Sequence, residues 1–375
     1  MIIERALEPV VLSKMGKSKA IIIMGARQVG KTTMLRKLFA NQTDVLWLNG
    51  DEIGVQNLFE SPSLGRLQAV IGNNRVVIID EAQRIKDIGT ALKLIIDGLP
   101  EVQLIATGSS SFDLANKINE PLTGRKWEYR MYPLSFSELS QHNGLLNERD
   151  MLTTRLVYGA YPDIATNPSD ARELLTQLSD SYLYKDLFQW ENINKPDKIV
   201  KLLQALAYQV GSQVSYPELG QTCGLDYKTV EKYIVFLEQC YVVFRLSSFS
   251  RNLRSELKRS RKIYFYDNGI RNAIISDFRP TENRNDIGAL WENYLISERI
   301  KHLNYSGQPA SSWFWRTQQQ NEIDYLEESD GQLRAYEFKW NPSAKTKLPP
   351  SFKTAYPNAT FQTITRNNYE DFLGG

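Results

Sequence analysis

The sequence has very few residues of the kinds that form disulfides or bind transition metals. Two of its 375 residues are cysteine and two are histidine. Cys223 and Cys240 lack metal-ligand spacing and lie in apolar, helical surroundings, which predicts buried, reduced thiols and a reducing compartment. His142 and His302 are isolated, and neither is assigned a role. A disulfide framework and a zinc site of cysteine and histidine ligands are therefore not expected.

Long apolar runs and a strong net charge are also missing. No run of about eighteen consecutive apolar residues occurs, and the amino-terminal segment is not a basic leader followed by an apolar stretch. We therefore expect a cytoplasmic protein that makes no membrane contact. The formal net charge is +2, so any contact with nucleic acid must come from local basic clusters. The length predicts two or three domains.

The most informative stretch runs from Ala20 to Leu38. Ile21–Ile23 is a β-branched run, and Met34–Leu38 continues a helical pattern without a breaker. Between them lies a segment with the Gly-x-x-x-x-Gly-Lys-Thr spacing of a phosphate-binding loop. The residues of this P-loop are Gly25, Ala26, Arg27, Gln28, Val29, Gly30, Lys31, Thr32 and Thr33.

The residue types of the P-loop suit a nucleoside triphosphate. Glycines let backbone N–H groups approach phosphate oxygens, and a helix that begins near Lys31 adds free N–H donors and a positive dipole end. We expect Lys31 to reach the β- and γ-phosphates and the Thr32 hydroxyl to ligate Mg²⁺. The sequence therefore predicts that ATP and Mg²⁺ bind here.

An acidic strand end follows further along the chain. Val76–Ile79 is apolar and runs into Asp80 and Glu81, which places two carboxylates at the carboxyl end of a strand, where open α/β sheets bind ligands. Asp80 is predicted to hold Mg²⁺, usually through a water, and Glu81 to polarise the attacking water as a general base. The next strand ends in Thr107-Gly108-Ser109-Ser110. A small hydroxyl there, with Thr107 as the first candidate, either contacts the γ-phosphate or the attacking water, or caps a turn.

Strand-like segments separated by helix-length segments predict βαβ units and a parallel sheet, hence an α/β fold. After a leading helix over residues 3–14 and the strand before the P-loop, these segments are Asp44–Asn49, Arg75–Ile79, Val102–Ala106 and Trp127–Met131. Arg125 precedes the last of them. It is either an ordinary surface charge or an arginine finger that acts in trans on a neighbouring subunit, which would require a homo-oligomer.

These motifs resemble a large bacterial and archaeal family of AAA+ type P-loop ATPases that carry a C-terminal restriction-endonuclease-like, PD-(D/E)xK domain. The resemblance extends over essentially the whole chain and rests on Gly25–Thr33, Ile79–Gln83, Thr107–Ser109, Thr123–Arg125 and Tyr132–Phe136. It implies a parallel sheet in the strand order 5-1-4-3-2, with Arg125 in the finger position.

The resemblance and the residue patterns together predict four segments. They are an ATPase domain at 1–150, a helical lid or connector at 151–195, a winged helix-turn-helix at 196–267 and a nuclease-like domain at 268–375. In the lid, Arg155 and Arg172 are each either a second nucleotide-sensing arginine or a surface charge.

The winged segment is predicted from three helices followed by two strands. The helices are expected at Ile199–Leu206, Pro217–Cys223 and Asp226–Cys240, and the strands at Tyr241–Leu246 and Lys262–Tyr266. Basic residues crowd the tip between the strands and are predicted to contact DNA phosphates; they are Arg251, Arg254, Lys258, Arg259, Arg261 and Lys262. The third helix adds Tyr227, Lys228 and Lys232. A solvated charge run or a protein-binding module is the alternative.

The C-terminal segment predicts the order αβββαβ, which is similar to PD-(D/E)xK nucleases and archaeal Holliday-junction resolvases. Glu337 and Lys339 are two apart and therefore share a face of their strand. Asp324 on an adjacent antiparallel strand would lie beside Glu337, and the two carboxylates would bind Mg²⁺ or Mn²⁺ while Lys339 orients water. Glu292 in the first helix completes the nuclease-like site. A cross-strand ion pair is the alternative, and the proline expected before Asp324 is missing.

The sequence thus predicts an Mg²⁺-dependent ATPase that is coupled to DNA binding and to metal-dependent DNA cleavage. The alternative is a nucleotide-gated switch or a remodelling ATPase whose nuclease-like domain only binds DNA or a protein partner. Both readings require the P-loop site.

Overall fold

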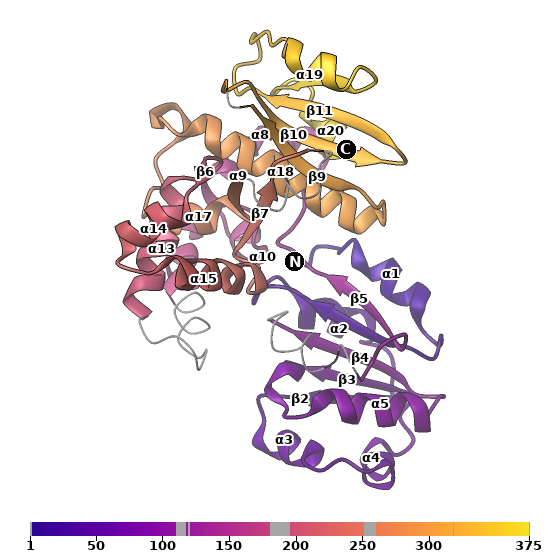
Figure 1. Ribbon diagram of the computed structural model, residues 1–375. Helices are drawn as coiled ribbons and strands as arrows, with labels where there is room; N and C mark the ends of the chain where they lie inside the picture. Colours follow the sequence, from indigo (N-terminus) through magenta and orange to yellow (C-terminus); the bar gives the residue numbers. More distant parts are fainter. Residues whose placement is uncertain are drawn as a thin grey trace. The chain divides into compact units, whose positions relative to one another are not determined.

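The computed structural model describes residues 2–109, 118, 121–180, 196–250, 260–317 and 319–374 (Figure 1). The chain divides into two compact units. The first comprises Met1–Pro133 and Gln239–Tyr241, and the second comprises Leu134–Glu238 and Val242–Gly375.

The first unit is built on a five-stranded sheet. Its strands are β1 Ala20–Met24, β2 Val45–Asn49, β3 Val76–Asp80, β4 Gln103–Gly108 and β5 Lys126–Arg130. They lie in the order β2-β3-β4-β1-β5, and all the pairings are parallel. This is the predicted order 5-1-4-3-2 read from the other edge, so that prediction is confirmed.

Helix α1 Leu7–Lys14 precedes the first strand. Further helices connect the strands because parallel neighbours need crossover connections. They are α2 Lys31–Leu38, α3 Ile53–Phe59, α4 Leu64–Ile71 and α5 Ile88–Gly98, with the 3-10 turn η1 Ala82–Arg84. β1 is buried along its whole length, as an apolar central strand should be. The carboxyl ends of β1, β3 and β4 meet at one edge of the sheet, which brings the P-loop to the end of β3 (Figure 1).

The second unit begins with a group of short helices. They are α7 Phe136–Asn143, α8 Leu145–Asp150, α9 Leu152–Tyr158, α10 Pro162–Thr166, α11 Ala171–Leu178 and, later in the chain, α17 Asn268–Ile274 followed by the turn η3 Thr281–Asn283. The buried carboxylate of Asp267 caps α17 and accepts the Ala160 N–H at 2.7 Å. The segment predicted as a lid therefore packs closely with α17; its residues 181–195 lie outside the described ranges.

The predicted winged segment contains the expected helices and strands and one more strand. The elements are α13 Pro196–Tyr208, β6 Gln213–Val214, α14 Tyr216–Cys223, α15 Tyr227–Gln239, β7 Val243–Ser247 and β8 Arg261–Phe265. The strands form an antiparallel sheet in the order β6-β8-β7. β6 was not predicted because two residues are too few to show an alternating pattern. Cys223 and Cys240 are both buried, as predicted.

The C-terminal part has the predicted αβββαβ order. Its elements are α18 Ile287–Ser306, β9 Ser311–Arg316, β10 Glu322–Ser329, β11 Gln332–Phe338, α19 Pro350–Ala355, β12 Thr360–Ile364 and the unpredicted α20 Tyr369–Leu373. The sheet order is β12-β11-β10-β9, with β9, β10 and β11 antiparallel and β12 parallel to β11. The chain after β7 meets β9, where the Phe249 N–H donates to the Phe314 carbonyl at 2.7 Å. The three-stranded and four-stranded sheets are therefore neighbours.

Candidate functional site

The P-loop has the backbone that a phosphate cradle requires. Gly30 has φ 96°, a left-handed conformation that suits glycine, and α2 begins directly after it at Lys31. A side chain at Gly25 would overlap the Met131 carbonyl, so the loop passes close to the backbone after β5. Lys31 is buried, and its ammonium donates to the carbonyls of Gly25 and Ala26, both at 2.8 Å. The loop itself therefore holds the cation that is expected to meet the phosphates.

Asp80 lies between two threonines at the end of β3. The Thr32 hydroxyl donates to Asp80 Oδ2 at 2.7 Å, and the Thr107 hydroxyl donates to Asp80 Oδ1. The structure thus brings together two residues predicted to share Mg²⁺. Thr107 is fully buried and also accepts the Glu81 N–H at 3.2 Å. In this state Thr107 positions Asp80 and Glu81.

Glu81 is held by Gln83 and Ser109, neither of which the sequence had paired with it. Glu81 has φ 49°, an uncommon conformation for a residue with a side chain. Its carboxylate Oε2 accepts hydrogen bonds from the Gln83 amide and, at 3.2 Å, from the Ser109 hydroxyl. Gln83 also donates to Ser109 at 2.9 Å. Both partners lie within motifs named from the sequence, Ile79–Gln83 and Thr107–Ser109, and their polar side chains at two adjacent strand ends were the available signal.

Arg5 is a residue that sequence reasoning missed altogether. It lies just before α1 and is 6% exposed. One guanidinium nitrogen donates to the Val29 carbonyl of the P-loop, and the other donates to the Tyr132 carbonyl at 2.7 Å. Arg5 therefore clamps the P-loop against the chain that follows β5. An arginine within an apolar helical segment was the only signal in the sequence.

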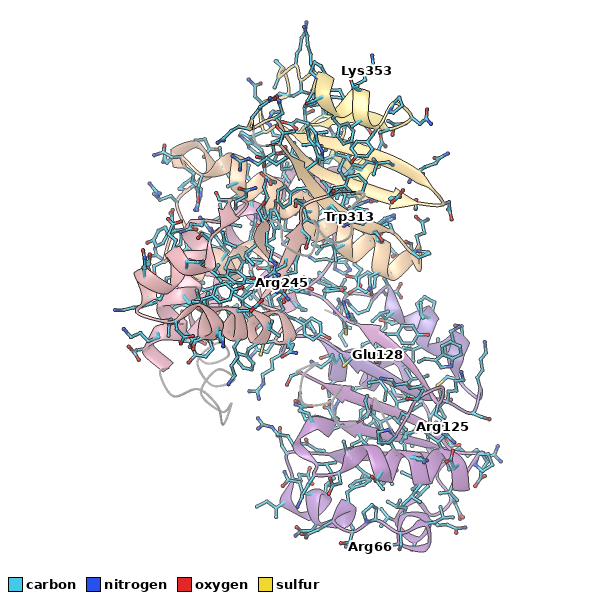
Figure 2. All side chains as sticks on the ribbon, in the orientation of Figure 1. Arg66, Arg125, Glu128, Arg245, Trp313 and Lys353 are labelled. Atoms are coloured by element: carbon cyan, nitrogen blue, oxygen red, sulfur yellow. The ribbon has the colours of Figure 1, made fainter. Side chains whose placement is uncertain are left out.

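Arg125 lies at the amino end of β5. The parallel register pairs Ala20 with Lys126 and Met24 with Arg130. Arg125 therefore lies at the amino ends of the strands, whereas its own P-loop lies at their carboxyl ends. Its guanidinium is 2.7 Å from Asp97, and its side chain is 43% exposed (Figure 2). Because the length of β5 separates Arg125 from the P-loop of its own chain, two interpretations are left: action in trans or a surface ion pair.

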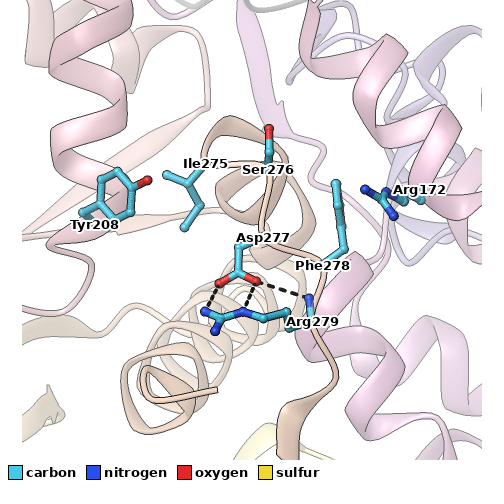
Figure 3. Close-up of a pocket in the computed structure, with 7 residues that line it drawn as sticks. All are labelled: Arg172, Tyr208, Ile275, Ser276, Asp277, Phe278 and Arg279. Carbon is cyan, nitrogen blue, oxygen red and sulfur yellow. Dashed lines mark hydrogen bonds and ion pairs between the residues drawn. The ribbon is translucent and has the colours of Figure 1, made fainter. Parts of the chain in front are cut away.

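Two further arginines were considered as nucleotide sensors. Arg155 is buried and forms an ion pair with Glu148 at 2.7 Å, so its guanidinium already has a charge partner within the second unit. Arg172 lies over the Phe278 ring, 5.6 Å from its centroid, and lines a pocket of about 470 Å³ (Figure 3).

The floor of this pocket is an ion pair. Asp277 accepts two hydrogen bonds from the Arg279 guanidinium, at 2.9 and 2.8 Å. Those bonds, supported by the charge of Arg284, lower the pKa of Asp277 to about 2.

The predicted basic tip is only partly described. Arg251, Arg254, Lys258 and Arg259 lie outside the described residues. Arg261 lies over the Tyr216 ring and 3.4 Å from Glu231.

Lys262 is not part of an exposed tip. Its side chain is 3% exposed, and its ammonium is 3.0 Å from Glu292 and 2.5 Å from Glu322. The prediction that Lys262 contacts DNA is therefore wrong, because β8 directs this side chain into the C-terminal part.

The predicted nuclease-like residues share one region of the C-terminal sheet. Antiparallel register pairs Tyr325 with Tyr336, which sets Asp324 across from Glu337. Asp324 accepts the Phe338 N–H at 2.8 Å, and Lys339 is 2.8 Å from Glu337. Asp324, Glu337 and Lys339 thus gather as predicted, but Lys339 is already ion-paired.

Electrostatics tie Glu292 to the same region. Burial raises the pKa of Asp324 well above its usual range; the charges of Glu292 and Glu337 raise it further, and Lys262 opposes them. Burial alone would lower the pKa of Lys262, but Glu292, Glu322 and Asp324 hold it above its ordinary value. In the part of the chain that the structure describes, no group of three or more histidine, cysteine, aspartate or glutamate side chains is arranged to hold a metal ion. Glu292 and Glu322 contact the Lys262 ammonium and Glu337 is paired with Lys339, so the carboxylates do not fit a divalent ion as they stand.

Three family models and several curated relatives match this chain. Residues 17–140 match an AAA domain, and residues 149–281 and 287–372 match two domains of unknown function (DUF8612 and DUF4143). An uncharacterized protein of Mycobacterium tuberculosis is 26% identical over 328 residues, which cover 86% of this chain and 70% of that protein. An uncharacterized protein of Methanocaldococcus jannaschii is 23% identical over 298 residues, covering 69% of this chain and 63% of that protein.

One solved structure shares the fold over much of the chain. A Walker-type ATPase of Pyrococcus abyssi aligns with a TM-score of 0.50 and 15% identity, covering 73% of this chain and 96% of that chain. The parallel sheet, the P-loop and the AAA match define the first unit as a P-loop ATPase domain. This domain is followed along the chain by the two regions that match domains of unknown function. Within the described ranges, no helix is both long and apolar enough to cross a membrane.

Proposed function

We propose that this protein binds Mg²⁺-ATP at the P-loop, hydrolyses it with Glu81 as the general base, and couples this reaction to DNA binding by residues 196–267. One observation carries the hydrolysis: Thr32 Oγ1 lies 2.7 Å from Asp80 Oδ2, with Glu81 directly following on the same strand end. Hydroxyl and carboxylate oxygens are the donors that Mg²⁺ prefers. Thr32 and Asp80 would hold the ion, which supplies charge stabilisation at the phosphates when bound.

The remaining steps belong to this chain's own side chains. Lys31 exchanges the carbonyls of Gly25 and Ala26 for phosphate oxygens, because an ammonium gains more from an anion than from neutral carbonyls. Glu81 accepts a proton from water and is oriented by Gln83 and Ser109.

The hydrolysis proposal is tested with two variants and a control. Lys31→Ala should weaken ATP binding, and Glu81→Gln should retain binding while kcat falls roughly 10²- to 10⁴-fold, the usual contribution of a general base. Lys37→Ala is the matched control, since this lysine of α2 pairs with Glu8 at 2.8 Å instead of facing the loop. Equal ATP turnover by all four proteins would reject the proposal.

We extend the proposal to a homo-oligomer in which Arg125 reaches the γ-phosphate of a neighbouring subunit. Its place at the edge opposite the P-loop supports action in trans. Specific activity of the parent should then rise with protein concentration. Arg125→Ala should lose roughly 10³-fold or more in kcat, as trans arginines typically supply. Constant specific activity across assembly would refute the trans role.

DNA is the proposed partner of residues 196–267. The order α13-β6-α14-α15-β7-β8 and the sheet order β6-β8-β7 are those expected of a winged helix-turn-helix. Tyr227, Lys228 and Lys232 lie on exposed positions of α15. Replacing Lys228 and Lys232 by alanine should weaken DNA binding and flatten its salt dependence by about one unit of slope for each lost phosphate contact. If protein partners rather than DNA stimulate hydrolysis, a remodelling ATPase is supported instead.

DNA cleavage by the C-terminal part is a second candidate function. It is favoured by the gathering of Asp324, Glu337 and Lys339 on one face of the β10–β11 pair, near Glu292. Supercoiled, single-stranded and branched DNA should be incubated with the protein and Mg²⁺ or Mn²⁺. Cleavage that Lys339→Ala abolishes would support it. Intact DNA would support a nucleotide-gated switch whose C-terminal part only binds.

A further inference from the structure

Lys262 is the most deeply buried cation of the carboxylate cluster in the C-terminal part, which comprises Glu292, Glu322, Asp324 and Glu337. Its side chain is 3% exposed, although it comes from β8 of the three-stranded sheet. Its ammonium contacts Glu292 at 3.0 Å and Glu322 at 2.5 Å. The two carboxylate partners compensate the charge of the buried ammonium. Moving Lys262 out of the cluster would leave those carboxylates without their charge partner, which is energetically costly.

Neighbouring groups hold Lys262 and its partners in place. The Tyr264 hydroxyl, two residues along β8, donates to the same Glu292 oxygen at 2.6 Å. The Lys262 ammonium also lies over the Phe314 ring of β9, 5.4 Å from its centroid. A backbone hydrogen bond from Phe249, just after β7, to Phe314 of β9 places the two sheets side by side in this state. The lysine is therefore positioned by the fold and not by a flexible loop.

The cluster has the charge of a divalent-cation site but not its geometry. A magnesium or manganese ion needs several oxygens converging at roughly 2.0–2.2 Å around one point. Here Glu292 and Glu322 converge on an ammonium at hydrogen-bond distances, and Glu337 is paired with Lys339 at 2.8 Å. A second cation among these oxygens would be repelled by the ammonium already there.

We propose that Lys262 takes the place of a divalent ion in this cluster, so that the C-terminal part as folded excludes Mg²⁺ and Mn²⁺ until Lys262 is withdrawn. The inference rests on the proposed nuclease-like role of the same residues and adds its regulation. A movement of β8 relative to α18 and β10 would free the carboxylates. A conformational change in residues 196–267 would thereby change the metal affinity of the nuclease-like cluster through Lys262.

Manganese binding tests this without relying on activity. The full chain, free of ATP, is titrated with MnCl₂ in a calorimeter as the parent, Lys262→Met, and Lys262→Met with Asp324→Asn. Arg245→Met is the control, because Arg245 is a half-buried cation of the same sheet, paired with Glu238 at 2.6 Å (Figure 2). Lys262→Met should bind Mn²⁺ at least tenfold more tightly than the parent, Arg245→Met should match the parent, and Asp324→Asn should remove the gain.

Two further measurements keep the proposal falsifiable if Lys262→Met folds poorly. Mn²⁺ should raise the melting temperature of Lys262→Met but not that of the variant that also carries Asp324→Asn. When Lys262 is retained, the parent and the Asp324→Asn variant should give equal heats of Mn²⁺ binding. Tight, Asp324-dependent Mn²⁺ binding by the parent would overturn the role of Lys262 and leave the proposed metal site standing. No binding by either parent or Lys262→Met would overturn both. Neither outcome touches the P-loop proposal, which ATP turnover measures separately.

Discussion

Replacing Arg5 by methionine tests whether the P-loop is held in shape from outside its own motif. The guanidinium is 6% exposed and donates to the carbonyls of Val29 and Tyr132. Methionine fills similar space without a donor, so two buried carbonyls would lose these hydrogen bonds. At about 1–3 kcal/mol for each unsatisfied group, the first unit should lose roughly 2–6 kcal/mol of its free energy of unfolding.

The functional effect should be larger on ATP binding than on the chemical step. Val29 directly precedes Gly30 and Lys31, so a loosened carbonyl disturbs the loop before nucleotide orders it. We expect a raised KM for ATP and a smaller fall in kcat. Arg5→Lys should be intermediate, because one ammonium replaces a planar fork that bridges two acceptors.

The assay combines region-specific and kinetic readouts. Hydrogen exchange followed by mass spectrometry should show faster exchange in the peptide that contains the P-loop, and saturating ATP should restore part of the protection. Lys37→Met is a suitable control because it removes a cation from α2 without touching the loop. Unchanged exchange and unchanged KM in Arg5→Met would refute the clamp.

Three other predictions follow from contacts of single side chains. Gln83→Ala removes a hydrogen bond to the Glu81 carboxylate, so kcat should fall roughly 10- to 100-fold with KM retained, as misplacement of a base typically costs; an unchanged kcat would show that Glu81 needs no such support. Glu148→Gln leaves Arg155 buried without its charge partner and should destabilise the second unit by about 3–5 kcal/mol, more than replacing both residues by apolar ones; chemical denaturation that ranks the variants otherwise would contradict it. The pKa of Asp277 is lowered to about 2 in the folded chain, so its ionised form adds stability above pH 4 that is lost as the pH falls towards 2. Asp277→Asn should therefore be less stable than the parent by up to about 2 kcal/mol at pH 7 and by about half of that at pH 3, and a difference that grows on acidification would reject this assignment.

The P-loop and the acidic strand end could be predicted from the sequence because their patterns are local. The P-loop spacing sets a glycine turn and a helix start over nine consecutive residues, and the pairing of Asp80 with Thr32 follows once β1 and β3 lie in one parallel sheet. Apolar strands separated by helices left few possible strand orders, and the resemblance selected the correct one.

Contacts between distant segments could not be predicted in the same way. Arg5 and Val29 meet across 24 positions, and Lys262 and Glu292 across 30. The local pattern around Lys262 indicates an exposed basic tip, because a run of charged residues does not show which distant side chains will pair with it.

The sequence by itself determined that a triphosphate-binding loop, an acidic strand end and a parallel sheet belong together, because hydrophobic alternation and backbone conformation are encoded over a few neighbouring residues. Only the tertiary structure decided which cations face solvent and which neutralise buried carboxylates. Burial depends on how β8 packs beside α18 and β10. The same lysine is a DNA-binding candidate in the sequence and the internal counter-charge of an acidic cluster in the folded chain.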